Sequence, residues 1–396
     1  MLLLVVLYIL CIAFGMPFYV MGAAWPAVYG EIEVPDSWLG IISVIMICCS
    51  IIANIFAVNL LKRFSPGVIL GASILMLGLA LIGYGFSASF ALLCVFAVPI
   101  GLAFGCFDVV LNDFIAVNYS SRHMNWIHCC WGLGATTGPL ILSSGMERFG
   151  SWRPGYYSIG GIQIAMAIVL FLSLPLWKKA AKPVEQKTER LKTNFREAMR
   201  IKGVKLTLIA LFFYCALEVT LGLWGSSYLV MVKNVSEERA AGWISLFFLG
   251  MTLGRLATGF LTIKLNNNQL IRFGGALIFV GLAILFLSAG EIAYMSGFFI
   301  FGFGCGPIWP CLVHETPKRF GESNSQHIVS LQIVSSNTGN AVAPLLFGFL
   351  TTFTGYGVLP LYLGVLLVVT MVTIEIQNGA ENKITKKLVA KYGKSD

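Results

Sequence analysis

Apolar stretches long enough to cross a bilayer follow one another along almost the whole chain, and this constrains the fold more than any motif. A helix needs about 20 residues to cross about 30 Å of hydrocarbon. By that rule we predict twelve spans, at about 2–28, 37–61, 67–88, 90–118, 124–146, 156–177, 205–232, 240–262, 270–289, 291–313, 326–352 and 357–376. Only 11% of the residues are charged, against about 25% in soluble domains. We therefore expect an all-α integral membrane protein.

One long polar segment divides the twelve predicted spans into six and six. We predict an N-terminal six-helix half at 1–177, a linker loop at 178–204, a C-terminal half at 205–376 and a tail at 377–396. The two halves share a spacing of glycine and proline at an offset of 205 residues, in which Gly134 and Pro139 match Gly339 and Pro344. Parallel six-span repeats with a site at their interface are a transporter architecture. We therefore predict two pseudo-symmetric halves.

The basic residues gather on one side of the predicted membrane. With the linker loop in the cytoplasm, 22 of the 27 Lys and Arg residues fall on the cytoplasmic side. Such a bias fixes orientation, so we predict a multi-pass protein of the plasma (inner) membrane with both termini cytoplasmic. The net charge of +9 is then a topology signal, and we expect the lipid bilayer, and no nucleic acid, as a partner.

The fourth span carries the most central acid of the first half, Asp108, with Asn112 one helical turn further along the same face. A carboxylate inside a membrane marks a solute or ion path by default, because it is costly unless it faces a polar cavity. We predict that Asp108 takes part in proton coupling and that Asn112 binds solute. The alternative is an Asp that a neighbouring helix neutralises.

Two more residues are predicted to couple protons. Glu218 is the midplane acid of the second half, and His128 lies in the fifth span, where a hydrogen-bonded helix contact is its alternative role. Asp113 points about 140° away from Asp108, so we predict that it pairs with a cytoplasmic Arg or Lys. Structural ion pairs are predicted for the three residues Asp113, Arg255 and Glu315, with Arg255 pairing with an acid such as Glu315.

Amides and aromatic rings within the spans are the candidates for solute binding. They are Asn112, Asn125, Trp131, Gln163, Tyr214, Trp309, Gln332 and Asn337. Fixed amides discriminate strongly between solutes, because an unmatched buried amide is penalised. We interpret Arg255 as lying too far toward the cytoplasm to reach the solute. Without a cation near the midplane, a neutral sugar or similar polyhydroxylated solute is the expected substrate.

Residue patterns typical of enzymes, metal sites and cofactors do not occur. The four histidines make no ligand pattern, and no glycine-rich loop is followed by Lys-Ser or Lys-Thr. All ten cysteines fall inside apolar runs, where cysteine behaves as a small hydrophobe. We therefore predict no enzyme activity, no metal and no cofactor.

Several motifs of this chain are similar to those of one transporter family. They are Asp108-x-x-x-Asn112, NWIHCCWGLGATTGP at 125–139, YCALEVTLGLW at 214–224, GMTLGRLATG at 250–259 and GCGPIWP at 304–310. By these motifs the sequence resembles the major facilitator superfamily, and within it the fucose:proton symporter branch. The resemblance implies a rocker-switch carrier in which Asp108 takes part in proton coupling. Asn112, Glu218 and residues of the fifth and eleventh spans would then border a sugar site.

The expected function is secondary active transport. We predict proton-coupled symport of a neutral sugar or similar small polar solute by alternating access, in a monomer. The alternative is a proton-driven exporter of amphiphilic compounds, which should have a larger and more apolar cavity. A channel and a transport-dead sensor also remain open at this point.

Overall fold

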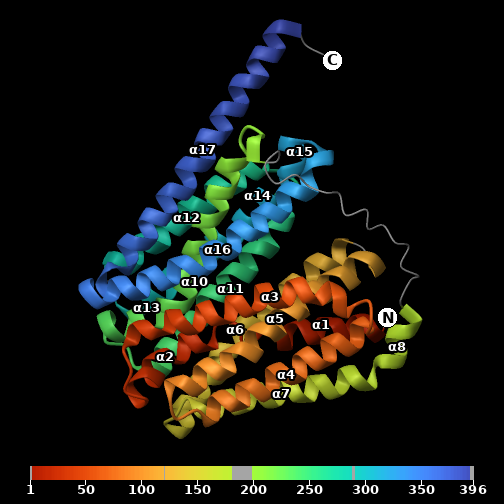
Figure 1. The fold of residues 1–396 in the computed structure, drawn as a ribbon. Helices are drawn as coiled ribbons and strands as arrows, with labels where there is room; N and C mark the ends of the chain where they lie inside the picture. Colours follow the sequence, from red (N-terminus) through yellow and green to blue (C-terminus); the bar gives the residue numbers. More distant parts are fainter. Residues whose placement is uncertain (1, 120, 181–198, 288–289, 393–396) are drawn as a thin grey trace.

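The computed structural model describes residues 2–119, 121–180, 199–287 and 290–392. These residues form helices joined by short turns (Figure 1). The first half of the chain contains α1 (Leu2–Gly15), α2 (Val20–Glu31), η1 (Asp36–Trp38), α3 (Leu39–Leu60), α4 (Pro66–Phe86), α5 (Phe90–Asn118), α6 (Ser121–Phe149), α7 (Arg153–Leu172) and α8 (Leu174–Ala180). The second half contains α10 (Val204–Lys233), α11 (Glu237–Leu261), α12 (Asn267–Leu287), α13 (Glu291–Cys305), α14 (Ile308–His314), α15 (Thr316–Phe320), α16 (Glu322–Thr354), η2 (Tyr356–Val358) and α17 (Leu359–Tyr392).

Among the described residues, eleven helical segments are long and apolar enough to cross a membrane. They account for all the predicted spans except the fifth, which is α6. Although α6 is more polar than the others, it has 29 residues and packs against α1, α7 and α11 inside the bundle. It is therefore the twelfth helix of the bundle, and the prediction of an all-α, multi-span membrane protein is confirmed.

The helices pack into two groups with the same internal arrangement. In the first group, defined as α1–α8, α1 packs on α6, α3 on α5, α4 on α5 and α4 on α7. In the second group, α10–α17, the corresponding pairs are α10 with α16, α11 with α13, α12 with α13 and α12 with α17. A repeated six-span unit is expected to give this order of pairs.

Proline divides two of the predicted spans. The first span is interrupted between α1 and α2 at Met16–Tyr19, and the tenth between α13 and α14 at Gly306–Pro307. Pro17 and Pro307 stand in these breaks, where the missing N–H and the ring of proline disfavour a continuing helix. Pro139 and Pro344 lie inside the continuous helices α6 and α16 instead. The break in the first span places Phe18 and Tyr19 at the centre of the molecule.

The two groups meet on one side of the bundle and diverge on the other (Figure 1). We call the side where α2 ends and α11 begins the far side, and the side where α1 and α10 begin the linker side. The contacts between the groups are mainly those of α2 with α10 and α11, of α3 with α16, and of α6 with α11. Ser226 Oγ donates to the Ala23 carbonyl at 3.1 Å, and Ser143 Oγ to the Glu238 carbonyl at 2.7 Å. Both bonds lie toward the far side, whereas the ribbons of the two groups lie farther apart on the linker side (Figure 1).

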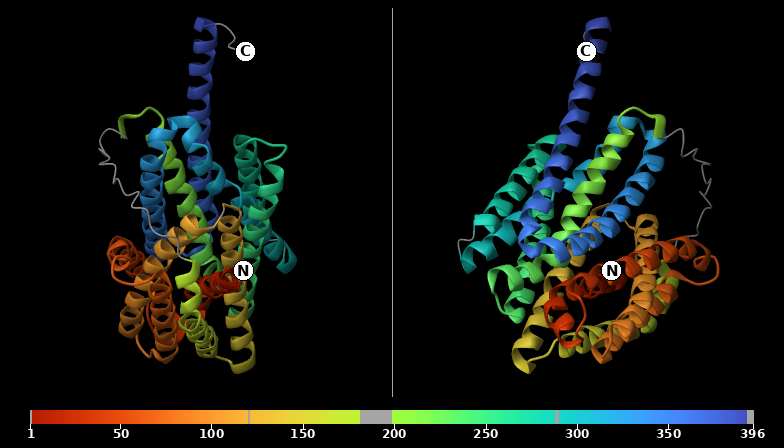
Figure 2. Two further views of the ribbon diagram at one scale, coloured as in Figure 1. Left: turned by 90° about the vertical axis from the view of Figure 1, so that its right-hand side faces the viewer. Right: turned by 60° about the vertical axis from the view of Figure 1, so that its left-hand side comes forward.

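Two predicted boundaries fall near the ends of the described residues. The segment 181–198, most of the predicted linker loop, lies outside them. The predicted tail at 377–396 begins as helix, because α17 continues to Tyr392. Figure 2 shows α17 projecting past the neighbouring helices on the linker side.

Candidate functional site

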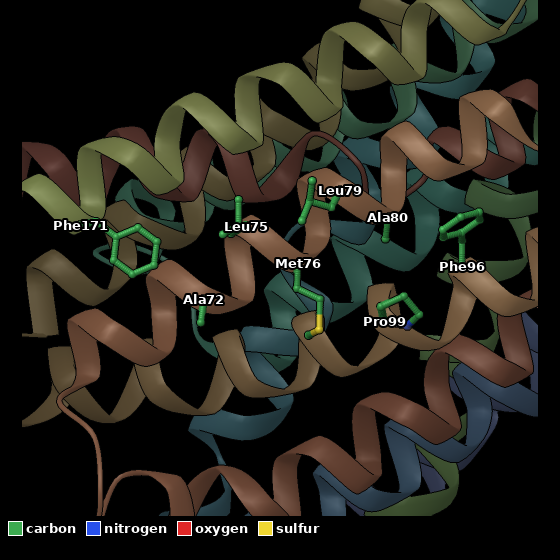
Figure 3. A pocket seen from close by; sticks show the side chains of 8 residues that line it. All are labelled: Ala72, Leu75, Met76, Leu79, Ala80, Phe96, Pro99 and Phe171. Atoms are coloured by element: carbon green, nitrogen blue, oxygen red, sulfur yellow. The ribbon is translucent and has the colours of Figure 1, made fainter.

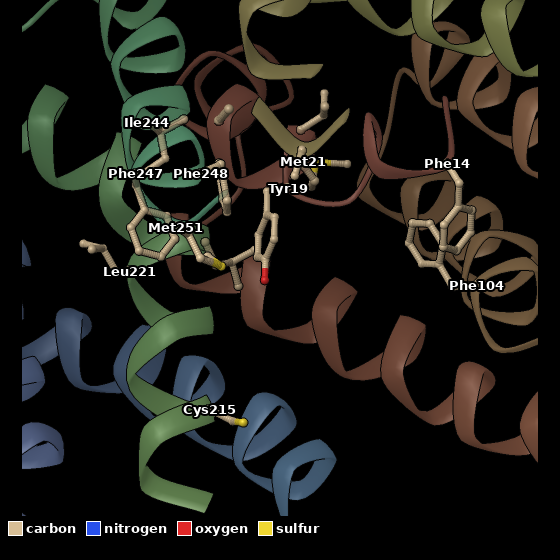
Figure 4. Packing of buried hydrophobic residues seen from close by; sticks show 14 of the residues in the cluster. Phe14, Tyr19, Met21, Phe104, Cys215, Leu221, Ile244, Phe247, Phe248 and Met251 are labelled. Carbon is tan, nitrogen blue, oxygen red and sulfur yellow. The ribbon is translucent and has the colours of Figure 1, made fainter. Parts of the chain in front are cut away.

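Aromatic rings around the break in the first span join the two groups at the centre of the molecule. Phe18 contacts Phe104 of α5 at 5.0 Å between ring centroids and Trp131 of α6 at 5.2 Å. Tyr19 stacks on Phe248 of α11 at 4.3 Å. Figure 4 shows Tyr19 beside Phe248 and Met251 of the second group. The break therefore places aromatic side chains of the first span against both groups.

Asp108 and Asn112 lie on α5 close to this aromatic region. Asn112 Nδ2 donates to Asp108 Oδ1 at 2.8 Å. Asp108 stands one turn after Phe104 and shares its face of the helix, so it points toward the side of α5 that meets the first span. Asp108 is exposed, although Phe104 and Phe107 beside it are buried. Asp108 thus has exposed surface on α5 and an amide as its neighbour.

Glu218 and Tyr214 form the corresponding pair on α10. Tyr214 Oη lies 2.6 Å from Glu218 Oε2 and 2.8 Å from the backbone carbonyl oxygen of Cys305. The tyrosine has one proton to donate, and both neighbours accept when Glu218 is ionised. When Glu218 carries a proton, it can donate to Tyr214 while Tyr214 donates to Cys305. Tyr214 therefore links Glu218 to the last residue of α13.

Arg255 lies at the boundary between the two groups. Its guanidinium carbon is 6.0 Å from the centroid of the Trp131 ring, so α11 of one group reaches α6 of the other. Arg255 is the eighteenth residue after the start of α11, and Asp108 is the eighteenth after the start of α5. Both helices begin on the far side. Arg255 therefore lies as many residues along α11 as Asp108 lies along α5. That no cation stands near the midplane stays a prediction.

His128 lies one turn before Trp131 on α6. It is exposed and within electrostatic range of Arg255. The approach of α6 to α11 is close here, because a side chain at Gly132 would overlap Thr252. His128, Trp131 and Arg255 thus form one cluster at the contact between the groups.

Two of the amides predicted to bind solute are helix contacts instead. Gln163 has no exposed surface, and its Nε2 donates to the Ala13 carbonyl at 2.5 Å. Gln332 is 1% exposed, and its Nε2 donates to Thr316 Oγ1 at 2.9 Å. Both amides are enclosed within their own helix group. The structure therefore argues against a direct contact of either amide with solute.

The remaining residues predicted to bind solute differ in their exposure and in whether the structure describes their side chains. Trp309 is 38% exposed and Asn337 is partly exposed. Tyr214 is buried and holds Glu218, as described above. The side chain of Asn125 lies outside the described residues. Contact of Trp309 and Asn337 with solute therefore stays a prediction.

The predicted ion pairs differ from those in the structure. Glu315 accepts a hydrogen bond from Asn267 at 2.6 Å and pairs with Arg319 at 3.6 Å. Its partner is thus Arg319, on its own turn of helix, rather than Arg255. Asp113 is exposed and has no ion-pair partner among the side chains that the structure describes.

A hollow of about 380 Å³ opens on the outer flank of the first group, away from this cluster. Its eight lining residues are all apolar and come from α4, α5 and α7 (Figure 3). An apolar hollow on the flank of a membrane-spanning group offers no partner to a polar solute. It is thus separate from the candidate site.

Comparison with known proteins identifies the family. The model of the Major Facilitator Superfamily matches residues 7–331, more than half of the chain. The chain belongs to the major facilitator superfamily. It is thus a secondary transporter, and the prediction that it is not an enzyme is confirmed.

Three curated relatives of this transporter share low identity over most of its length. "Bypass of stop codon protein 6" of Saccharomyces cerevisiae is 24% identical, over 89% of this chain and 78% of its own. The glucose/mannose transporter GlcP of Bacillus subtilis is 20% identical, over 73% of each chain. The cis,cis-muconate transport protein of Acinetobacter baylyi is 22% identical, over 76% of this chain and 75% of its own.

Solved structures of transporters share the fold. A bacterial homologue of the human lysosomal transporter Spinster, inward-facing and unoccupied, matches with a TM-score of 0.74 at 15% identity, over 97% of each chain. The nucleoside transporter NupG matches with a TM-score of 0.76 at 11% identity, over 93% of this chain and 99% of its own. At these identities the matches establish the fold alone.

In this transporter, sequence reasoning missed the contact of Arg255 with Trp131. Counted from the start of its predicted span, Arg255 lies 15 residues into the eighth span and Asp108 lies 18 residues into the fourth, which does not place Arg255 nearer the cytoplasm than Asp108. The aromatic contacts of Phe18 had no comparable signal, because an apolar ring looks the same in sequence whether it faces lipid or a neighbouring helix.

Proposed function

We propose that this transporter is a proton-coupled symporter of a sugar or a similar small, polyhydroxylated solute, and that it works by alternating access. The observation that carries the proposal is the pairing of each central acid with one neutral donor. Asp108 accepts from the Asn112 amide, and Glu218 from the Tyr214 hydroxyl. Neither acid has an ion-pair partner among the described side chains. A proton, rather than a positively charged side chain, is therefore the group that neutralises each of the two acids.

The two acids belong to different helix groups, which suits coupling. Movement of the groups against each other changes the surroundings of Asp108 on α5 and of Glu218 on α10. A carboxylate whose surroundings alternate can take up a proton on one side and release it on the other. The wider separation of the groups on the linker side and their contacts on the far side fit one state of this cycle.

Sugar-sized solutes are supported by the chemistry of the site and by the names of the relatives. Asn112, Asn337 and the rings of Trp131 and Trp309 offer the amides and aromatic faces that hydroxylated solutes use. The relatives and structural neighbours include transporters of glucose and mannose, of muconate and of nucleosides. The solute is thus small and polar, and its charge is a separate question because Arg255 lines the site.

The proposal extends to the cellular setting. We place both termini and the linker side in the cytoplasm of a cell whose plasma (inner) membrane holds the protein as a monomer. The bias of basic residues supports this orientation. A cysteine introduced at Gln186 in a cysteine-free background should not react with an impermeant reagent added outside the cell. Reaction from outside would reverse the orientation.

The test of coupling is Asp108→Asn in proteoliposomes, with Asp113→Asn as the matched control. Asp113 is an exposed acid of the same helix, five residues further on. Asp108→Asn should abolish accumulation driven by a proton gradient but keep counterflow, because exchange needs alternation and no net proton movement. Asp113→Asn should keep both activities. If Asp108→Asn accumulates solute at the wild-type level, Asp108 has no part in the mechanism.

The substrate class is tested with a panel of hexoses, deoxyhexoses, organic anions and lipophilic cations, at equal proton gradients. If only lipophilic cations move, and they move outward, the protein is an exporter and the symport proposal fails.

A further inference from the structure

Arg255 is a cation at the centre of the transporter that the proposed function does not use. It stands as many residues along α11 as Asp108 along α5, and its guanidinium faces Trp131 across the boundary between the two helix groups. Tyr19, Tyr214 and His128 are within electrostatic range of it. Arg255 thus lies among the residues that the two groups bring together.

The guanidinium makes no ion pair within 4.0 Å among the described side chains, although Glu218 acts electrostatically on the same Tyr19 and Tyr214. Its Nε is buried and has no hydrogen-bond partner in the part of the chain that the structure describes. An arginine inside a membrane protein is costly unless an anion or a polar cavity compensates its charge. The site is therefore incomplete without an anionic group.

Three acids of the bundle have hydrogen-bond or ion-pair partners other than Arg255. Glu218 is held by Tyr214 of its own helix at 2.6 Å, and Asp108 by Asn112 at 2.8 Å. Glu315 pairs with Arg319 and accepts from Asn267. An anionic solute bound between the two helix groups would supply the partner that Arg255 lacks.

The shape of the guanidinium points to a carboxylate. Its five N–H donors form a planar fork that matches a carboxylate with two parallel hydrogen bonds. The cation–π contact with Trp131 does not use the N–H groups of Arg255 as hydrogen-bond donors, and the Nε–H is buried without a partner among the described residues. Arg255 is the one Arg or Lys in the middle of a predicted span. A single positive charge suits a monocarboxylate better than a phosphate dianion, which would keep one charge unpaired.

We propose that Arg255 and Trp131 form a carboxylate subsite, so that the transported solute is a hydroxylated monocarboxylate of the sugar-acid type. This inference rests on the proposed function, since it names the charge of the solute in the same central site. Trp131 orients the guanidinium, the N–H edge of Arg255 binds the carboxylate, and amides such as Asn112 remain for the hydroxyl groups.

The experiment uses matched solutes that differ in the carboxylate. Glucuronate and gluconate are compared with glucose and sorbitol, both as ligands in thermal-shift assays and as substrates in proteoliposome counterflow. A ligand that binds only the native state raises its melting temperature. The variants are Arg255→Gln and Arg255→Lys. The control is Arg239→Gln, an exposed arginine that pairs with Glu291 near the far side.

In the wild type, glucuronate and gluconate should raise the melting temperature more, and exchange faster in counterflow, than glucose and sorbitol. Arg255→Gln should weaken the apparent affinity for the acids by about tenfold to a hundredfold, as expected for loss of charge-assisted hydrogen bonds. Arg255→Lys should recover part of that loss, because the charge remains without the fork. Arg239→Gln should leave the preference for acids intact.

Two results would overturn the subsite. If glucose exchanges as well as glucuronate in the wild type and in Arg255→Gln, the carboxylate is not recognised, and symport of a neutral sugar stands. If Arg255→Gln loses exchange of acids and neutral solutes alike, and Glu218→Gln restores it, the anion for Arg255 is Glu218. If Asp108→Asn accumulates solute like the wild type, coupling through Asp108 fails independently of the subsite.

Discussion

The far side and the centre of this transporter bring the same two helix groups together by different means. From the start of α2 toward the far side, the groups meet through small residues and backbone carbonyls, as where Gly22 packs on the backbone of Leu223. At the centre they meet through large aromatic and charged side chains, such as Tyr19 on Phe248 and Arg255 on Trp131. Where the backbones approach this closely, they form what we call the far-side seal, and one added methyl group would prevent the two groups from closing together. Side-chain contacts, in contrast, can be replaced by contacts with solute.

The difference suggests a division of labour in alternating access. The far-side contacts contain few hydrogen bonds between the groups, and Ser226 to Ala23 is one of them. Surfaces held mainly by packing can separate without leaving buried charges unpaired. The central contacts carry charge, so their state depends on protons and on solute. The comparison therefore predicts that far-side changes shift conformation and that central changes alter coupling and selectivity.

The largest effect is expected from blocking the far-side seal with Gly22→Leu. A Cβ at Gly22 would lie 2.6 Å from the Leu223 carbonyl oxygen, and backbone cannot move aside as a flexible side chain can. Overpacking of this kind costs about 1–3 kcal/mol or more, which falls on the closed far side alone. Transport should nearly stop, while a cysteine introduced at Ser226 should become reactive to an impermeant reagent.

Gly259→Leu is the matched control for this seal, because a Cβ at Gly259 meets nothing within 4 Å. It should transport and label like the wild type. If Gly22→Leu transports normally, the far-side contact is not a seal, and the contrast between the two regions fails.

A smaller effect is expected from Tyr214→Phe at the centre. The change removes the hydroxyl that links Glu218 to the Cys305 carbonyl, with little change in volume. A net hydrogen bond of about 0.5–1.5 kcal/mol corresponds to roughly two- to tenfold. We expect proton-driven accumulation to fall by that factor, while solute counterflow stays closer to the wild-type rate.

Tyr228→Phe is the control for Tyr214→Phe, since it removes a hydroxyl from the same helix. Tyr228 donates to the Leu285 carbonyl at 3.1 Å and touches no acid. Equal losses of accumulation in the two variants would mean that Tyr214 acts through packing alone, without a part in coupling.

Sequence alone predicted the membrane spans and the central acids well, because both follow from local composition. A run of about 20 apolar residues admits few structures, and an acid within it is costly unless it faces a polar cavity or a partner. The partner of Asp108 was also accessible, because a residue four positions further on shares its face. The prediction of Asn112 beside Asp108 needed no knowledge of the neighbouring helices.

The direction in which an amide faces could not be read in the same way. Gln163 and Asn112 both lie inside spans, yet Gln163 is enclosed by α1 and α7 whereas Asn112 borders Asp108. The rotation of each helix depends on packing between helices far apart in sequence. A proline within a span did not by itself predict a helix break either, because Pro17 stands in a break while Pro139 lies in a continuous helix.

The smallest effect is expected from Gln163→Met, which distinguishes a helix contact from a solute ligand. The change removes the hydrogen bond from Nε2 to Ala13, but it also removes Oε1, which is buried without a partner among the described residues. The two changes oppose each other, since a lost hydrogen bond destabilises and a removed unsatisfied oxygen stabilises. The melting temperature should therefore shift by less than about 2–4 °C, with no change in the order of preferred solutes.

A changed order of preferred solutes across the substrate panel would instead place Gln163 in contact with solute, as the sequence predicted. The surfaces of α1 and α7 that enclose Gln163 would then belong to the binding site, and burial within one helix group would no longer separate structural amides from solute-binding ones.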